Sequence, residues 1–589
     1  MIMSLVMSFA KRGERWLVGL CLSLCLMISI VSASQTQADA AASAYQNGLS
    51  DIRKNDLSSA RTNLEKAVRL APANAEAHES LGWLLAQQGE FPAAERELKL
   101  ALKLKPVLVD ARITLSGILL QRGNLDEAEK ESRAAVKAAS TNPEAHRVLG
   151  RTLLQMKSLA EATTELRRAA ELAPDRADIH DDLGTVLAQQ ADYENAMKEF
   201  SEALHLQPNF ARAHFHLGLA HMQQHRLDEA LKELHQATVL APKDSASHFY
   251  LAQVLTAQSK NSEALEELRT AAELKPDWFE AQIALGLASQ RAGDAEGAVG
   301  AFRRAVKLRP ENAEAHNDLG LALIQTGDAP GSIQEFQNAL RINPSDTAYR
   351  ENLGVGYLQK TDFEDAMREF RTALQDAPDD ATLHYNLGLA LKLSDQLSAA
   401  VAELQKAAQL DPAQADVRYT LGVTLWQQGE FAQAVDALQA AVQAKPDYAE
   451  AYYTLGTVLK QQGKLAEAAA ALREALRLQP DFAGAHTTLA TVLRLLGDAE
   501  GAAAESKRGS ELANSANAAQ AATFATNSGM RLLNAGDLDG AISQFRSAIQ
   551  MNNAYALAHY HLGEALQRKG DRAGAEQEFQ LARQLSPSK

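Results

Sequence analysis

Histidines at a repeated spacing are the residues of this chain best suited to chemistry. Nine of the fifteen occupy one register of a 34-residue period: His78, His146, His180, His214, His248, His316, His384, His486 and His559. Zinc holds imidazole nitrogens at about 2.1 Å, whereas equivalent residues of neighbouring helices lie about 8–10 Å apart. We therefore expect these nine side chains to pack against their surroundings rather than to bind a metal.

A second histidine group is better placed for a metal. His221 and His225 stand four residues apart on one face of a predicted helix, with His214 and His216 nearby, but no Glu or Cys completes a known ligand pattern. The sequence also contains no phosphate-binding glycine loop, nucleophile elbow or zinc-protease signature. We therefore predict no catalytic residue, no metal and no cofactor.

The histidines belong to a repeat that fills nearly the whole chain. A small residue returns every 34 residues from Gly48 to Ala490, and after a step of 39 residues the pattern resumes at Gly529 and Gly563. In the resulting sixteen copies, Ala stands twelve residues after the small residue in fifteen, and Pro stands twenty-four residues after it in thirteen. A period this regular predicts an array of identical structural units, each too small to bury a core alone.

One copy shows which unit is repeated. Apolar residues in 421–425 and again in 431–442 recur at helical spacing, so each segment predicts an amphipathic helix. Gly429 ends the first helix and Pro446 ends the second. The small Gly422 and Ala434 allow the two helices to approach closely. The repeat is therefore predicted to be a helical hairpin, and the fold an all-α solenoid.

This pattern of Leu-Gly, then Ala with Phe or Leu four residues later, then Ala and Pro, resembles the tetratricopeptide repeat. The resemblance covers residues 41–589 and implies a right-handed superhelix whose first helices line a concave groove. The chain departs from the family at the fourth position of the first helix, where Trp is common in the family and His is common here. The predicted organisation is a leader or membrane anchor at 1–33, a short linker at 34–40, fourteen repeats at 41–510, an irregular linker or hinge at 511–525, and two repeats at 526–589.

Candidate partner-binding residues follow from that resemblance. The fifth position of the first helix carries aromatic residues in several repeats, the sixth carries asparagine in some, and two basic residues lie near the end of the helix in repeats thirteen and fourteen. These candidates are Phe215, Phe249, Tyr385, Tyr419 and Tyr453, then Asn352 and Asn386, then Lys460 and Arg494. Aromatic side chains supply contact area at low entropic cost, which suits peptide binding. The alternative is that the fifth position is half-buried packing, and that the basic residues are solvated surface charge.

The N-terminus differs from the rest of the chain. Lys11, Arg12 and Arg15 precede an apolar run at 16–31, which small residues follow, as in a secretory signal peptide. Residues 16–33 together are also long enough to remain as an inner-membrane anchor. The only cysteines, Cys21 and Cys25, lie within it. We expect an exported protein, periplasmic or secreted.

Charge narrows the class of partner. The chain has a formal net charge of −15, spread along the repeats, whereas nucleic-acid binding requires a basic face. We therefore predict protein or peptide partners and no nucleic acid. The last predicted helix has no capping helix after it, so the C-terminal end is also expected to favour self-association.

These observations predict a non-catalytic interaction scaffold or adaptor of the cell envelope that binds partners along its groove. One alternative is a structural component of a bacterial polysaccharide-export or envelope assembly. A second is a targeting subunit for a glycosyltransferase that acts in trans. The sequence leaves the partner, the pathway and the oligomeric state open.

Overall fold

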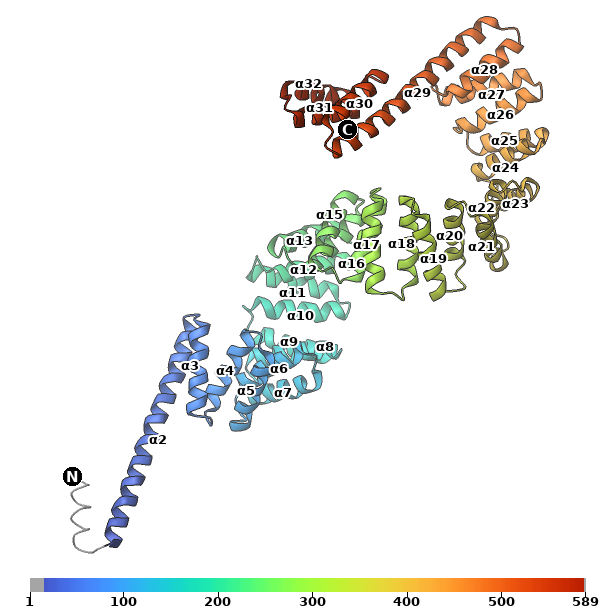
Figure 1. Cartoon of the computed structure of the whole chain (residues 1–589). Helices are drawn as coiled ribbons and strands as arrows, with labels where there is room; N and C mark the ends of the chain where they lie inside the picture. The colour runs from blue at the N-terminus through green and yellow to red at the C-terminus, as the bar shows by residue number, and fades with distance from the viewer. Residues whose placement is uncertain (1–14, 587–589) are drawn as a thin grey trace. The chain divides into compact units, whose positions relative to one another are not determined.

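The protein is built from helices throughout the range that its structure describes. The computed structural model describes the backbone of residues 15–586 and the side chains of Ser23 and of residues 35–586. Within that range it has 31 α-helices and no strand (Figure 1). The chain divides into two units, Met1–Gly297 and Ala298–Lys589. The predicted all-α solenoid is confirmed.

The first unit consists of a series of antiparallel helix pairs. Its helices are α2 (Arg15–Arg53), α3 (Leu57–Leu70), α4 (Ala75–Gln87), α5 (Phe91–Leu104), α6 (Val109–Gln121), α7 (Leu125–Ala138), α8 (Pro143–Gln155), α9 (Leu159–Leu172), α10 (Ala177–Gln189), α11 (Tyr193–Leu206), α12 (Ala211–Gln223), α13 (Leu227–Leu240), α14 (Ser245–Ala257), α15 (Asn261–Leu274) and α16 (Phe279–Arg291). The boundary between the units falls within α17 (Ala295–Leu308).

The second unit continues the same alternation of helices. Its helices are α18 (Ala313–Thr326), α19 (Ala329–Ile342), α20 (Thr347–Gln359), α21 (Phe363–Asp376), α22 (Ala381–Leu393), α23 (Leu397–Leu410), α24 (Ala415–Gln428), α25 (Phe431–Ala444), α26 (Ala449–Gln461), α27 (Leu465–Leu478), α28 (Ala483–Leu495), α29 (Ala499–Asn534), α30 (Leu538–Met551), α31 (Ala556–Lys569) and α32 (Arg572–Leu585).

Close approach of the two helices explains the small residue of each repeat. A Cβ added to Gly82 would lie 2.6 Å from Cγ of Leu98, and one added to Gly184 would lie 2.5 Å from Cε1 of Phe200. In both pairs the large residue comes sixteen positions later, on the second helix. The copy that has Ser116 instead of glycine has the small Ser132 at the partner position. The two side chains thus share the space between the paired helices.

The turn inside each hairpin has the same backbone conformation in all sixteen copies. A residue with positive φ follows the first helix, and it is glycine in nine copies, including Gly429 at φ +88°. In the other seven it is another residue, such as Ala191 at φ +61° or His225 at φ +55°. The left-handed conformation stops the helix and lets the chain reverse, so the predicted role of Gly429 is confirmed.

The nine register histidines share one hydrogen-bond arrangement, which we call the histidine clamp. In each clamp Nδ1 lies 2.5–2.7 Å from the carboxylate of a glutamate nineteen residues later, on the second helix. Nε2 lies 3.0–3.2 Å from a backbone carbonyl six residues earlier, in the preceding loop. The clamp therefore joins both helices of a hairpin to the loop that leads into it, and both ring nitrogens have a partner.

Protonation of His180 strengthens its clamp because both of its partners are acceptors. A neutral imidazole donates through one nitrogen only, whereas an imidazolium donates through both. At His180 the hydrogen bond to Glu199 raises the pKa above its ordinary value of 6.5; burial opposes this increase, and the carbonyl of Pro174 adds to it. The folded protein therefore binds the proton more tightly than the unfolded chain does. This part of the stability is complete below pH 6.5 and is lost as the pH rises through the folded-state pKa.

We expect Glu199→Gln to lower the pKa of His180 and to weaken the loss of stability at alkaline pH. Hydrogen–deuterium exchange at imidazole C2, followed by mass spectrometry across pH 5 to 9, gives that pKa. Glu194→Gln is the matched control, because Glu194 lies on the same helix and pairs with Lys198 instead. Identical titration of His180 in the wild type and in Glu199→Gln would contradict the charged clamp.

The structure corrects two predicted linkers. Residues 511–525, predicted as an irregular linker or hinge, lie inside the continuous helix α29. The N-terminal half of α29 completes repeat fourteen, and its C-terminal half, with Gly529 against Phe545, opens repeat fifteen. The proline of other repeats is replaced by Asn514 here, and the alanine-rich stretch that follows favours a helix. Residues 34–40 are likewise helical, within α2, since neither proline nor glycine interrupts them.

The predicted leader at 1–33 lies largely outside the described residues. Its first fourteen residues have no described structure, and the remainder forms the start of α2 without described side chains other than Ser23. In the part of the chain that is described, no helix combines the length and the apolar content that a membrane span requires. Export stays a prediction.

Candidate functional site

An open groove runs along the first helices of the N-terminal repeats. Its larger chamber has a volume of about 840 Å³ and draws its walls from α4, α6 and α8, and from the residue that opens α5. The apolar part of this lining is Trp83, Ala86, Phe91, Ile113, Ile118, Leu120 and Val148, the polar part is Gln87, Thr114, Gln121, Glu144, Arg151 and Gln155, and Gly117 and Gly123 complete it. This chamber is large enough for several side chains of a ligand.

A second chamber adjoins the first. It has a volume of about 440 Å³ and is lined by Leu49, Ile52, Glu79, Ser80, Trp83, Asp110, Ile113, Thr114 and Glu144. Four of these residues, including Trp83 and Ile113, line both chambers, so the groove continues from α2 to α8. Trp83 is half-buried and packs against the core formed by the first repeats, which fixes the position of its indole.

The smaller chamber is acidic. Of its nine lining residues three are carboxylates and none is Lys or Arg. Glu144 is neutralised by Arg147 at 3.2 Å and Arg176 at 3.0 Å. Within the described residues, no ion pair is formed by Glu79 or Asp110. Burial is the main cause that raises the pKa of Glu79, and the nearby Asp110 adds to it, although the backbone N–H of Ala111 donates to Oε1 at 2.8 Å and opposes the shift.

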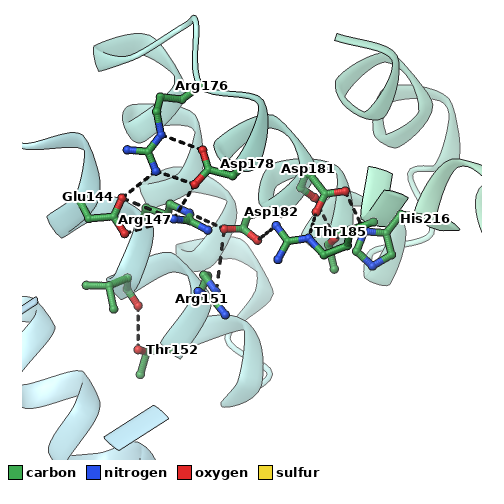
Figure 2. A network of polar contacts seen from close by, with 12 residues as sticks. Glu144, Arg147, Arg151, Thr152, Arg176, Asp178, Asp181, Asp182, Thr185 and His216 are labelled. Carbon is green, nitrogen blue, oxygen red and sulfur yellow. Dashed lines mark hydrogen bonds and ion pairs between the residues drawn. The ribbon is translucent and has the colours of Figure 1, made fainter. Parts of the chain in front are cut away.

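A network of charges begins at the groove, with Glu144 and Arg151, and continues from α8 to α12 (Figure 2). Arg147 contacts Asp178 and Asp182, both at 2.7 Å. The fully buried Asp181 lies 2.6 Å from Arg212 and 2.9 Å from Nδ1 of His216. Every carboxylate of this network has a cationic or imidazole partner, which offsets the cost of burial. The network therefore joins three consecutive repeats and leaves no spare charge for a ligand.

The predicted aromatic residues make contacts between successive repeats. The ring centroids lie 5.1 Å apart for Tyr419 and Tyr448, and 4.7 Å apart for Tyr453 and Phe482. Tyr385, half-buried, packs against the same core cluster as Tyr419 and Tyr453.

The aromatic residues of the first unit are arranged similarly. Phe249 is 6% exposed and lies 4.5 Å from Trp278 between centroids. Tyr250 lies 5.7 Å from Phe215 and so connects these two predicted residues. Phe215 also lines a smaller pocket of about 360 Å³ with Arg212. The geometry matches the packing alternative stated above, and a role in ligand binding stays a prediction.

The predicted asparagines connect neighbouring repeats as well. Asn352 donates to Asn317 at 2.8 Å, and Asn386 donates to Glu351 at 2.9 Å. In each pair the sixth position of one repeat bonds the fifth position of the repeat before it, thirty-five residues earlier. Lys460 is half-buried and Arg494 is exposed. The structure assigns neither of them an ion pair within its described range.

Sequence profiles of one family match most of the chain. Two profiles described as "Tetratricopeptide repeat" match residues 45–107, 119–181, 217–277, 283–347, 419–481 and 453–519. A third, described as "TPR repeat", matches residues 184–225, 356–395, 393–429 and 529–570. The chain belongs to the tetratricopeptide repeat family. A comparison with curated protein sequences finds no significant match.

Several solved structures resemble this tetratricopeptide repeat protein. PilF of Pseudomonas aeruginosa is 22% identical, covers 35% of this chain over 94% of its own, and has a TM-score of 0.33. YrrB, described as "a TPR protein with an unusual peptide-binding site", is 21% identical over 31% of this chain and 95% of its own, with a TM-score of 0.27. Cut9 in complex with Hcn1 is 14% identical over 88% and 95%, with a TM-score of 0.32.

Sequence reasoning did not single out Glu79, Trp83 or Ile113. The residues predicted at the fifth position of the tetratricopeptide repeat are aromatic, whereas in the first repeats that position carries Glu79 and Ile113. Trp83 stands one residue after the register glycine, at a position where most repeats have small or aliphatic residues. A large aromatic residue at that position was the signal available in the sequence.

Proposed function

We propose that this protein is a non-catalytic scaffold that binds an extended peptide segment of its partners in the groove of α2, α4, α6 and α8. The observation that carries this proposal is the continuous pair of chambers of about 840 and 440 Å³, which share Trp83 and Ile113. Membership of the tetratricopeptide repeat family supports an interaction scaffold. The groove adds a place where one segment of a partner fits.

Three glutamines along the groove suit a peptide backbone. Gln87, Gln121 and Gln155 are exposed, stand 34 residues apart and line the larger chamber. Their side-chain amides make no hydrogen bond to other described residues. Each amide offers a donor and an acceptor. Successive repeats advance about 10 Å, which is about three residues of an extended chain. Successive glutamines can therefore hydrogen-bond to peptide units that are three residues apart.

The apolar residues would provide most of the affinity. An aromatic ring held rigidly at the centre of a groove is the typical hot spot of a protein interface. Trp83 has this position because it borders both chambers, with Ile52 and Ile113 beside it. A side chain of the peptide placed against the indole therefore loses its water contact on several sides.

Replacement of Trp83 by alanine is expected to weaken peptide binding by about a hundredfold. The full chain is panned against a peptide library displayed on phage, and the affinity of each enriched peptide is measured by fluorescence anisotropy. Trp426→Ala is the matched control, because Trp426 is also half-buried on a first helix but lies outside the groove. Equal affinity of Trp83→Ala and the wild type, or no enriched peptide, would refute the proposal.

We further propose that the scaffold acts in the cell envelope, as an exported protein with a cleaved or retained leader. The basic residues Lys11, Arg12 and Arg15 before an apolar run support export. The chain has no cysteine outside that run, so its repeats depend on no disulfide, which is consistent with export to a bacterial cell envelope. Fractionation of cells that express the full chain, with the mass of the recovered protein, locates it and shows whether the leader is removed.

A further inference from the structure

We infer that the groove selects peptides in which a lysine or arginine side chain lies next to an aliphatic residue, with the cation seated between Glu79 and Asp110 and against Trp83. This inference rests on the proposed function and names the class of segment that the groove prefers. It commits to a side-chain cation within the peptide. A free peptide amino terminus is excluded by the probe described below.

The charge balance of the smaller chamber is the first argument. Glu79 and Asp110 border it without a cationic partner, whereas Glu144, the third carboxylate, is already neutralised by two arginines. A neutral or acidic ligand would leave Glu79 half-buried, with the backbone N–H of Ala111 as its only hydrogen-bond donor among the described residues. A basic side chain supplies the missing charge, and partial burial makes such a pair stronger than one on an open surface.

The other charged residues near the smaller chamber already have partners or line the larger chamber. Glu76, one helical turn before Glu79, is already held by Lys105 at 2.6 Å. Arg151, the basic residue of the larger chamber, does not line the smaller one and lies 3.9 Å from Asp182. The cation would therefore enter the chamber at Glu79 and not the one at Arg151.

The apolar walls give the second argument. Leu49, Ile52, Trp83 and Ile113 line the same chamber as the carboxylates. Lysine and arginine bury their methylene stems along such surfaces while the charged group reaches a polar partner. An indole also attracts a cation held over its face. An aliphatic neighbour in the peptide would extend along the shared wall into the larger chamber.

The raised pKa of Glu79 is consistent with an unmet charge. Burial raises it most, and the nearby carboxylates of Asp110 and Glu76 add to this, although the hydrogen bond from Ala111 and the more distant Lys105 oppose the increase. A bound cation would remove that unfavourable interaction. Peptide binding is therefore expected to release a proton from Glu79 when the solution is acidic enough for it to be partly protonated.

The test uses two short synthetic peptides, acetylated and amidated at their ends, that differ at one position. One carries lysine between two leucines, and the other carries glutamine there. Fluorescence anisotropy with the full chain is expected to give about tenfold tighter binding of the lysine peptide at low salt. The difference should shrink at high salt because mobile ions screen the pair.

Variants of the chain assign the preference to the chamber. Glu79→Gln combined with Asp110→Asn should remove the tenfold difference while the glutamine peptide binds as before. Asp126→Asn is the matched control, because Asp126 is exposed on the second helix α7 and should leave the difference intact. A lysine preference that persists in the double variant would overturn the inference.

The outcomes separate this inference from the proposed function. If both peptides bind the wild type equally and Trp83→Ala binds neither, the groove binds peptides but does not select a cation, and only this inference is overturned. If neither peptide binds the wild type, the proposed function and this inference both fail. They also both fail if each peptide binds Trp83→Ala with the same affinity as the wild type.

Discussion

Valine in place of Gly184 is expected to destabilise the hairpin of α10 and α11 by about 3 kcal/mol. The Cβ alone would lie 2.5 Å from Phe200, whose ring is 1% exposed and cannot move away without displacing its neighbours. Valine adds two methyl groups at that point. The gain in helix propensity over glycine is less than about 1 kcal/mol and does not compensate.

Urea unfolding followed by backbone hydrogen exchange in residues 177–206 measures this effect. A local probe is needed because repeat arrays do not unfold as one cooperative unit. Gly117→Ala is the control, because nothing lies within 4 Å of its added Cβ, and it should leave the fold unchanged or slightly more stable. Unchanged protection of α10 in Gly184→Val would show that the interhelical spacing is adjustable.

A second change restores the volume. The chain itself pairs Ala252 with Leu268 in the same register, and both are buried. Gly184→Ala together with Phe200→Leu reproduces that pair and should be more stable than Gly184→Ala alone.

Removal of the Arg147 guanidinium is expected to cost about 3 kcal/mol. Its side chain is 12% exposed and lies 2.7 Å from both Asp178 and Asp182, of which the second is 9% exposed. Burial lowers the pKa of Arg147, but Asp182, Glu144 and Asp178 raise it more, so the cation is firmly held. Arg147→Met keeps the aliphatic packing and removes only the charge, which leaves buried carboxylates undercompensated.

The partner substitution distinguishes charge from packing. Replacing both members of a buried ion pair by apolar residues is often close to neutral. We therefore expect Arg147→Met combined with Asp182→Leu to recover most of the loss, because Arg212 keeps its contact with Asp181. Local hydrogen exchange in α8 and α10 provides the measurement. A double variant no more stable than Arg147→Met alone would contradict a charge-based role for the network (Figure 2).

The sequence by itself determined the repeat and its hairpin. The period of 34 residues, the small register residue and the closing proline are local constraints, because each concerns helices that are adjacent in the chain. Gly82 and Leu98 illustrate this. The two residues in contact are sixteen positions apart, and because the same separation recurs in register, spacing alone reveals it. For the same reason the packing role expected of the histidines follows from their register.

The partner of each histidine was also present in the sequence. Every one of the nine has a glutamate nineteen residues later, and Arg112 and Arg350, in the same register, pair with Glu131 and Glu369 at the same separation. A search for residues that vary together within the repeat would have found the clamp. Composition alone gave no sign of it.

Only the tertiary structure decided which positions face an open groove. The fifth position packs against the next repeat at Phe249 and Tyr419 but lines a chamber at Glu79 and Ile113. The difference depends on side chains in neighbouring repeats, which a single-repeat pattern does not include. The fusion of two helices in α29 was missed for a related reason, because the interruption of a period resembles a loop. Helix propensity and the absence of proline decided the actual conformation there.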